Sequence, residues 1–195
     1  MAVIVVPFTS QRLDQPAEIS EFLKPYGIEY ERWEVEGRIG ADASSEEILA
    51  TYRPEIDALK TRGSYVTADV INVTAATPGL DQMLEKFSKE HTHSEDEIRF
   101  IVKGRGVFHI HPKNAPVFSI QTDAGDLINV PAGTQHWFDL CSERTIRAIR
   151  LFKDPAGWTP AYMPEGVHYR FSPVCWGVEH LPSLATQRKL TVSKS

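Results

Sequence analysis

The chain has 195 residues, of which 42% are hydrophobic, and its formal net charge is −5 at pH 7. This length suggests one domain with elaborations, and the hydrophobic fraction is enough for a real core. The negative charge and the lack of a basic stripe argue against a nucleic-acid partner. No apolar stretch approaches the roughly 18 residues that span a membrane, so no membrane partner is expected.

The N-terminus and the cysteines favour a soluble cytoplasmic protein. The apolar run Val3–Val6 is too short for a signal peptide, no basic residue precedes it, and it predicts an opening strand. Cys141 and Cys175 do not form a metal-type C-x-x-C pair. Two buried free thiols are the favoured interpretation, and a disulfide is the alternative. A monomer is expected by default.

Short helices are predicted between about residues 16 and 63. Pro16–Lys24 carries apolar residues on one helical face, and Asp14 can cap it. A strand is predicted at Tyr30–Val35. The capping-box pattern Ser44–Glu47 opens a second helix, and Glu55–Lys60 forms a third.

From about residue 66 the pattern changes to strands. Val66–Val73 is β-like, and Leu80–Phe87 is a further short helix or an irregular arm. Beyond it, short apolar segments recur at close intervals, at Ile98–Val102, Val107–His111, Val117–Thr122, Leu127–Val130, Trp137–Leu140 and Thr145–Phe152. Lys103–Gly106 is interpreted as a hairpin turn. The rhythm predicts an antiparallel sandwich or barrel.

Within this pattern we expect one domain over residues 1–177. Its helical elaboration covers roughly residues 16–63, and its barrel core covers roughly residues 66–152. The remaining residues 178–195 are polar and weakly patterned, so we expect a loosely ordered tail.

Three histidines and one glutamate form a candidate site for one metal ion. His91 and His93 stand at i and i+2, so on a strand their side chains point to one face. Glu97 shares that face if the strand continues without a bulge, and His136 would close the site from another strand. Mixed imidazole and carboxylate ligands suit Fe, Ni, Mn or Zn better than Ca or Mg.

The residues around this site resemble the two motifs of the cupin superfamily. The motifs are His91-x-His93-x3-Glu97-x6-Gly104 and Gly125-x5-Pro131-x-Gly133-x2-His136. Leu140 stands where the second motif often ends in Asn. The resemblance implies a mainly β fold, a small jelly-roll barrel that holds one metal ion, here with short N-terminal helices.

A narrower resemblance is to the acireductone dioxygenase family. It rests on the string HTHSEDEIRFIVKGRG from His91 to Gly106 and on the segment from Asp126 to Phe138. The arm Met83–Phe87, the strand Arg147–Phe152 and the Gly157-Trp158 pair also resemble that family. The similarity covers most of residues 66–160.

The family resemblance implies a function in methionine salvage and methionine biosynthesis. Its members cleave 1,2-dihydroxy-3-keto-5-methylthiopentene, an acireductone, with O2. With Fe(II) they give formate and 4-methylthio-2-oxobutanoate, and with Ni(II) they give formate, CO and methylthiopropionate. One Fe(II) or Ni(II) per chain would be held by the four residues His91, His93, Glu97 and His136.

Resemblance and strand parity together suggest roles for further residues. Arg99 lies two residues beyond Glu97 and would face inward, where its charge would stabilise the anionic substrate, with Arg150 as a second cation. Phe87, Phe138 and Trp158 would form an apolar pocket for the methylthio tail.

Three other functions stay open at this level. The chain could be another cupin dioxygenase that acts on a thiol or a phenolic acid, or a Zn-dependent sugar isomerase. It could also be a non-catalytic metabolite-binding cupin that keeps its metal for structure. His109 and His111 form a second H-x-H pattern, but no acid follows at ligand spacing, so satisfied or solvent-facing histidines are expected.

Overall fold

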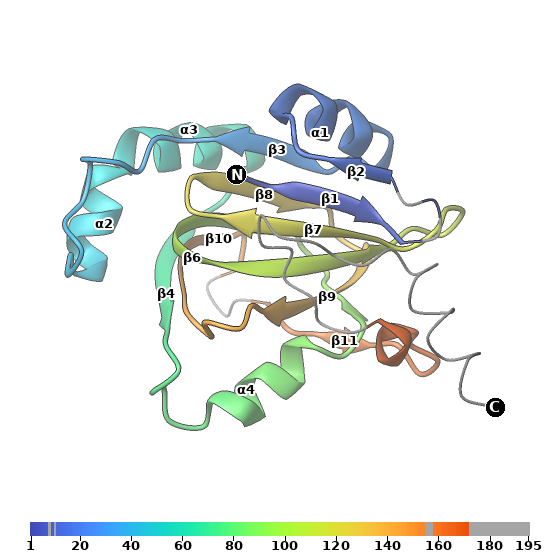
Figure 1. Ribbon diagram of the computed structural model, residues 1–195. Coiled ribbons are helices and arrows are strands. Elements are labelled where there is room, and N and C mark those ends of the chain that lie inside the picture. Colours follow the sequence, from blue (N-terminus) through green and yellow to red (C-terminus); the bar gives the residue numbers. More distant parts are fainter. Residues whose placement is uncertain (8, 10, 155–157, 172–195) are drawn as a thin grey trace.

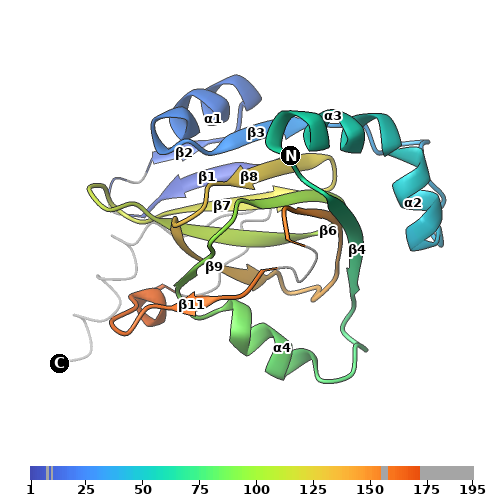
Figure 2. The ribbon, with the colours of Figure 1, turned by 180° about the vertical axis from the view of Figure 1, so that it is seen from behind.

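The computed structural model describes residues 1–171 except residues 8, 10 and 155–157. The expected tail at 178–195 and Cys175 lie outside the described residues. Within them, no helix is long and apolar enough to cross a membrane. Figure 1 and Figure 2 show a β-structure with α1 and α3 across one side and α4 on the opposite side.

Most regular structure in the described chain is β. The strands are β1 Val3–Val6, β2 Gln11–Leu13, β3 Glu29–Arg32, β4 Thr67–Val73, β5 His91–Thr92, β6 Glu97–His111, β7 Phe118–Asp123, β8 Asp126–Val130, β9 Gln135–Leu140, β10 Ile146–Phe152 and β11 Ala161–Tyr162. The helices are α1 Pro16–Leu23, α2 Ser45–Thr51, α3 Arg53–Gly63 and α4 Leu80–Phe87, with 3₁₀ turns η1 Lys24–Tyr26 and η2 His168–Arg170.

The predicted mainly β fold with short N-terminal helices is confirmed, and most predicted elements fall within a few residues of the observed ones. The capping box that opens α2 is present, with Ser44 and Glu47 bonding each other's backbone N–H groups. The predicted cap of α1 is wrong, because Gln15 takes the cap position and Asp14 accepts a hydrogen bond from the Gln15 side chain instead.

Strand β6 joins the two sides of the barrel. Its first half pairs with β8 and β10, and its second half pairs with β7 and β9, all antiparallel. The predicted hairpin at residues 103–106 is therefore wrong. Gly104 bends one continuous strand there with φ +78°, and a Cβ on it would lie 2.0 Å from the Thr145 carbonyl oxygen. Glycines in strands commonly mark such bends at barrel corners.

Side chains alternate across β6 between two cores. Ile98 and Phe100 point outward into a cluster with Tyr52, which lies between α2 and α3, and with Leu59 of α3, whereas Ile101 points into the barrel interior. By the same alternation Glu97 and Arg99 face the interior. The helices thus cover the outer face of one sheet and leave its inner face for the site.

Cys141 is buried and disulfide-bonded. The interpretation of this residue as a free thiol is therefore wrong, and the alternative, a pairing with Cys175, lies outside the described residues.

Candidate metal centre

The four predicted ligands come together inside the barrel, but not from the continuous strand that we expected. Strand β5 ends at Thr92, residues 94 and 95 form a bend, and Glu97 opens β6. The ligands converge because β5 pairs with β9, which places His91 directly opposite His136. The Gly133 N–H donates to the His93 carbonyl oxygen over 2.9 Å and ties the two ligand-bearing loops together.

The side chains of the four residues are buried and close. His91, Glu97 and His136 are each 2% exposed, and His93 is 8% exposed. Their ligand atoms all lie within 4.8 Å of one another. Glu97 Oε2 is 3.1 Å from Nε2 of both His93 and His136.

Backbone carbonyls fix the orientation of all three rings. Nδ1 lies 2.6 Å from Lys89 O in His91, 3.2 Å from Thr159 O in His93, and 2.8 Å from Thr134 O in His136. A carbonyl oxygen only accepts, so each Nδ1 donates a proton to it and each ring turns its Nε2 toward the centre. Such a hydrogen bond on the far nitrogen is the usual arrangement around metal-bound histidine.

The electrostatics of the centre favour a cation. Burial and the neighbouring His136 lower the pKa of His91 to about 4, so this ring is neutral at pH 7. Burial opposes ionisation of Glu97, but Arg99 and the two histidines outweigh it and hold the pKa of Glu97 well below its usual range. Three imidazole Nε2 atoms and a carboxylate therefore lie close together, and this set of atoms fits a transition-metal ion.

Arg99 lies beside the centre in an aromatic surround. It is 3% exposed, and its Nε is 2.7 Å from Glu97 Oε1, although the two atoms lack hydrogen-bond geometry. Its guanidinium carbon lies 4.7 Å from the Phe138 ring centroid, 5.6 Å from that of Trp158 and 5.8 Å from that of Phe87. The structure thus brings together the three predicted pocket residues around the predicted cation.

Arg150 also lies on the inner face, but it is paired. Its Nε and Nη2 donate to the two carboxylate oxygens of Asp69 over 2.9 and 2.6 Å. Its guanidinium carbon is 5.6 Å from the Trp158 ring centroid, and Trp158 in turn stacks on His93. No local sequence pattern identifies Asp69, because its partner Arg150 is 81 positions away.

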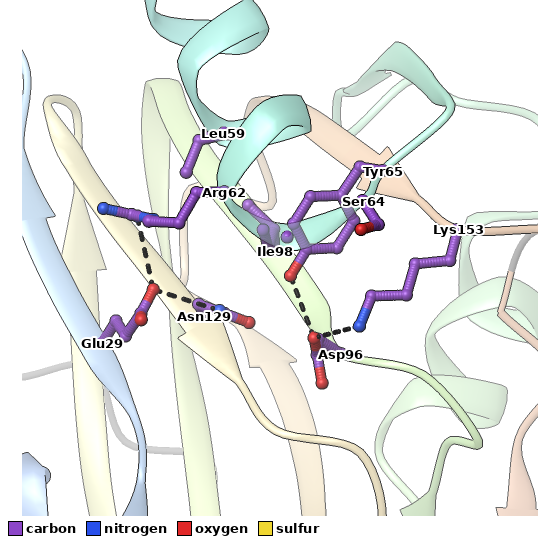
Figure 3. A pocket seen from close by; sticks show the side chains of 10 residues that line it. Glu29, Leu59, Arg62, Ser64, Tyr65, Asp96, Ile98, Asn129 and Lys153 are labelled. Atoms are coloured by element: carbon purple, nitrogen blue, oxygen red, sulfur yellow. Dashed lines mark hydrogen bonds and ion pairs between the residues drawn. The ribbon is translucent and has the colours of Figure 1, made fainter.

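Asp96 is a partly buried contact point that no sequence motif identifies. Its carboxylate accepts from Tyr65 Oη, Lys153 Nζ and the Ala132 backbone N–H. It lines a cleft of about 340 Å³ on the outer side of β6, together with Arg62 and Glu29 (Figure 3). The paired charges of this cleft lie outside the barrel, so it is separate from the candidate metal centre.

The second H-x-H pair contacts other side chains of the protein. His109 is 2% exposed, with Nδ1 2.8 Å from Ser119 Oγ, and its ring stacks on Trp137. His111 is partly exposed, and its Nδ1 lies 2.6 Å from Glu90 Oε1. The expected protein partners are thus found for Nδ1 of both histidines, whereas the buried Nε2 of His109 has no hydrogen bond and lies 3.3 Å from Asp139 Oδ2.

Fold and site together define a cupin-type barrel with a candidate metal centre in its interior. The family model of the ARD/ARD' family matches residues 9–160. The chain belongs to the ARD/ARD' family.

Named relatives agree with this assignment. An acireductone dioxygenase of Picosynechococcus sp. is 42% identical over 84% of this chain and 93% of its own length. One from Stutzerimonas stutzeri is 43% identical over 79% of this chain and 84% of its own length. A solved acireductone dioxygenase from Bacillus anthracis, with a cadmium ion in its active centre, has a TM-score of 0.77 and 38% identity. It covers 83% of this chain and 98% of its own.

Proposed function

We propose that this chain is a metal-dependent acireductone dioxygenase. Family membership supports the reaction class, and one observation in the site carries the metal dependence. Three imidazole nitrogens and a carboxylate converge in the buried interior of the barrel, and a bound cation would be coordinated by all four at once. His91, His93, Glu97 and His136 are the proposed ligands.

A bound Fe(II) or Ni(II), one per chain, would supply a Lewis acid and a template for an electron-rich substrate. The protein would bind and orient that substrate. The Arg99 guanidinium lies beside the Phe138 ring next to the proposed ligands, and its buried Nε has no hydrogen-bond partner among the described residues. We assign this guanidinium to the enediolate oxygens of the acireductone, because charge-assisted hydrogen bonds are the strong ones.

The aromatic rings would exclude water and hold the apolar end of the substrate. Phe138 is 3% exposed, and Phe87 packs at the edge of the inner core. Together with Trp158 they offer an apolar wall to a methylthio group. Arg150 is the proposed second cation, and it acts from within its pair with Asp69.

The ion would decide the products. Fe(II) would give formate and 4-methylthio-2-oxobutanoate, and Ni(II) would give formate, CO and methylthiopropionate. The ligand set accepts both ions, because imidazole and carboxylate bind either one. This reaction would place the protein in methionine salvage.

The test is turnover by protein of defined metal content. The protein is stripped of metal, loaded with Fe(II) or Ni(II), mixed anaerobically with the acireductone and then exposed to O2. We expect loss of the enediol absorbance, release of formate, and CO with Ni(II) alone. No acceleration over spontaneous oxidation with either ion would refute the proposal.

The same experiment separates the alternatives. A protein that binds one ion per chain but turns over a thiol or a phenolic acid would be another cupin dioxygenase. Metal binding without any turnover would indicate a metabolite-binding cupin, and activity with Zn on a sugar would indicate an isomerase.

We further propose a single domain over residues 1–177 and a monomeric, cytoplasmic protein. The disulfide at Cys141 does not support the cytoplasmic location, because disulfides are rare in reducing compartments. Fractionation of cells and gel filtration of the purified protein test these two points.

A further inference from the structure

A row of charged residues crosses three neighbouring strands on the inner face of the barrel. Asp69 of β4 lies opposite Arg150 of β10, and Arg150 lies opposite Arg99 of β6. The two arginines are thus like charges in directly opposed positions, which is unfavourable in an antiparallel sheet. Each of them needs a compensating carboxylate.

The two carboxylates act differently. Asp69 forms a two-pronged ion pair with Arg150, at 2.9 and 2.6 Å, and uses both of its oxygens. Glu97 lies 2.7 Å from Arg99 Nε without a hydrogen bond, and its other oxygen faces two histidines. The Arg99 guanidinium thus has no hydrogen bond from its Nε, whereas Asp69 engages both Nε and Nη2 of Arg150.

The guanidinium groups of Arg99 and Arg150 lie beside the same aromatic ring. Each guanidinium carbon lies 5.6 Å from the ring centroid of Trp158. Trp158 thus lies beside both guanidinium groups, and the strand register places Asp69, Arg150 and Arg99 in one row.

We propose that Asp69 is a positioning and specificity-determining residue, which holds Arg150 away from the bound anion and leaves Arg99 as its main cationic contact. This inference rests on the proposed function, since it describes the same cavity. The charges of Glu97 and Arg99 cancel, and so do those of Asp69 and Arg150. With a divalent ion bound, the site would therefore carry two net positive charges. A chelating dianion would neutralise them.

Loss of the Asp69 carboxylate would leave a net positive charge beside the candidate site and release the Arg150 guanidinium. Anions would then bind more tightly, and doubly charged anions would gain more than singly charged ones. Tighter binding of substrate and products alike lowers KM without raising kcat.

The first test uses oxalate, a planar dianion with two adjacent oxygens, titrated into Ni(II)-loaded protein by calorimetry. Asp69→Asn should bind oxalate about tenfold more tightly than the wild type, and the gain should shrink as salt is added. Acetate, with one charge, should gain less. Equal oxalate affinities, including no measurable binding to either protein, would overturn the inference.

A double-mutant cycle asks whether Asp69 acts through Arg150. In an Arg150→Gln background, Asp69→Asn should change oxalate affinity much less than in the wild-type background. Asp69→Glu, which keeps the charge, should stay near the wild type. Asp81→Asn, which breaks the exposed pair with Arg144, is the matched control and should have no effect. If Asp69→Asn raised oxalate affinity equally in the Arg150→Gln background, Asp69 would not act through Arg150 and the inference would be wrong.

Turnover separates this inference from the proposed function. Asp69→Asn should lower KM for the acireductone several-fold and leave kcat unchanged or lower. If the wild type fails to accelerate acireductone oxidation but the oxalate cycle behaves as expected, the proposed function fails and the role of Asp69 stands. If the wild type turns over and the cycle shows no coupling, the inference alone fails.

Discussion

Glu97 connects the two halves of the candidate site at the scale of single residues. One carboxylate oxygen faces Nε2 of His93 and His136, and the other faces the Arg99 guanidinium. The same side chain is therefore placed to bond a metal on one side and to balance the buried cation on the other. Substitution of Glu97 and of Arg99 should accordingly have different outcomes.

Glu97→Gln should lose metal. The amide keeps the shape, but it removes the negative charge and points N–H or a weaker oxygen donor at the histidine nitrogens. We expect metal affinity to fall about 100-fold or more, since even indirect partners of a metal site are worth 10–100-fold. Competition with a chelator measures the affinity. Glu95→Gln, in the same loop, is the control, and wild-type affinity in Glu97→Gln would remove this residue from the ligand set.

Arg99→Ala should keep the metal and lose turnover. The substitution removes the donors assigned to the substrate anion and leaves all four proposed ligands in place. Loss of one such electrostatic donor costs about 10²–10³ in kcat. Steady-state O2 uptake and metal analysis of the same preparation measure both properties. Arg105→Ala, on the same strand but half-exposed, should retain full rate. A fully active Arg99→Ala would show that the assigned role is wrong.

The bend of β6 at Gly104 determines the barrel at the scale of elements. The bend lets one strand pair with β8 and β10 before it and with β7 and β9 after it. The glycine has φ +78°, and the Thr145 carbonyl oxygen occupies the place of a Cβ. Both the backbone conformation and the close approach exclude other residues.

Gly104→Ala should therefore destabilise the protein by clearly more than the conformational penalty alone, which is about 1–2 kcal/mol for a left-handed residue. Gly37 is a matched control, because it has φ +74° but nothing within 4 Å of the place that a Cβ would take. Urea unfolding of Gly104→Ala and Gly37→Ala measures the difference. Equal losses of unfolding free energy in the two variants would mean that the backbone around Gly104 moves to accommodate a Cβ without extra cost.

The ion pair between Arg38 and Glu55 attaches α3 to the preceding loop and should make stability depend on pH. The hydrogen bond from Arg38 lowers the pKa of Glu55 below its usual value. A carboxyl whose pKa is lower in the folded state stabilises the protein above the unfolded pKa of about 4.3 and loses this effect as pH falls through the folded pKa.

Glu55→Gln should thus lower the free energy of unfolding by about 0.5–1 kcal/mol at pH 7, the range of partly exposed pairs. The difference from the wild type should vanish toward about pH 3. Urea unfolding at a series of pH values measures this, with the exposed Glu21→Gln as control. A difference that is independent of pH would rule out the ion pair as its source.

At the scale of the whole molecule, the sequence predicted what local patterns can encode. Residue type and spacing identified His91, His93, Glu97 and His136, and strand parity placed Arg99 inward. The alternation of side chains did not predict the strand boundaries. A glycine such as Gly104 is equally compatible with a turn and with a bend inside one strand.

Long-range pairs were not predictable from one sequence. Asp69 is recognisable only once β4 lies beside β10, and the contacts of Asp96 come from three separate segments. The short strands β2 and β11 have too few residues for a periodic pattern. What a single sequence lacks is thus the register between distant strands.

Strand β6 has strand partners along its whole length, and this arrangement affects how the barrel unfolds. A strand bonded to β7, β8, β9 and β10 cannot be released without separating both sides of the barrel. Its amide hydrogens should therefore exchange with deuterium only through global unfolding, whereas those of the short edge strand β2 should exchange through local fraying. Native-state hydrogen exchange in increasing denaturant should find the slowest protons on both sides of Gly104. β6 would then be the last part of the barrel to lose its structure.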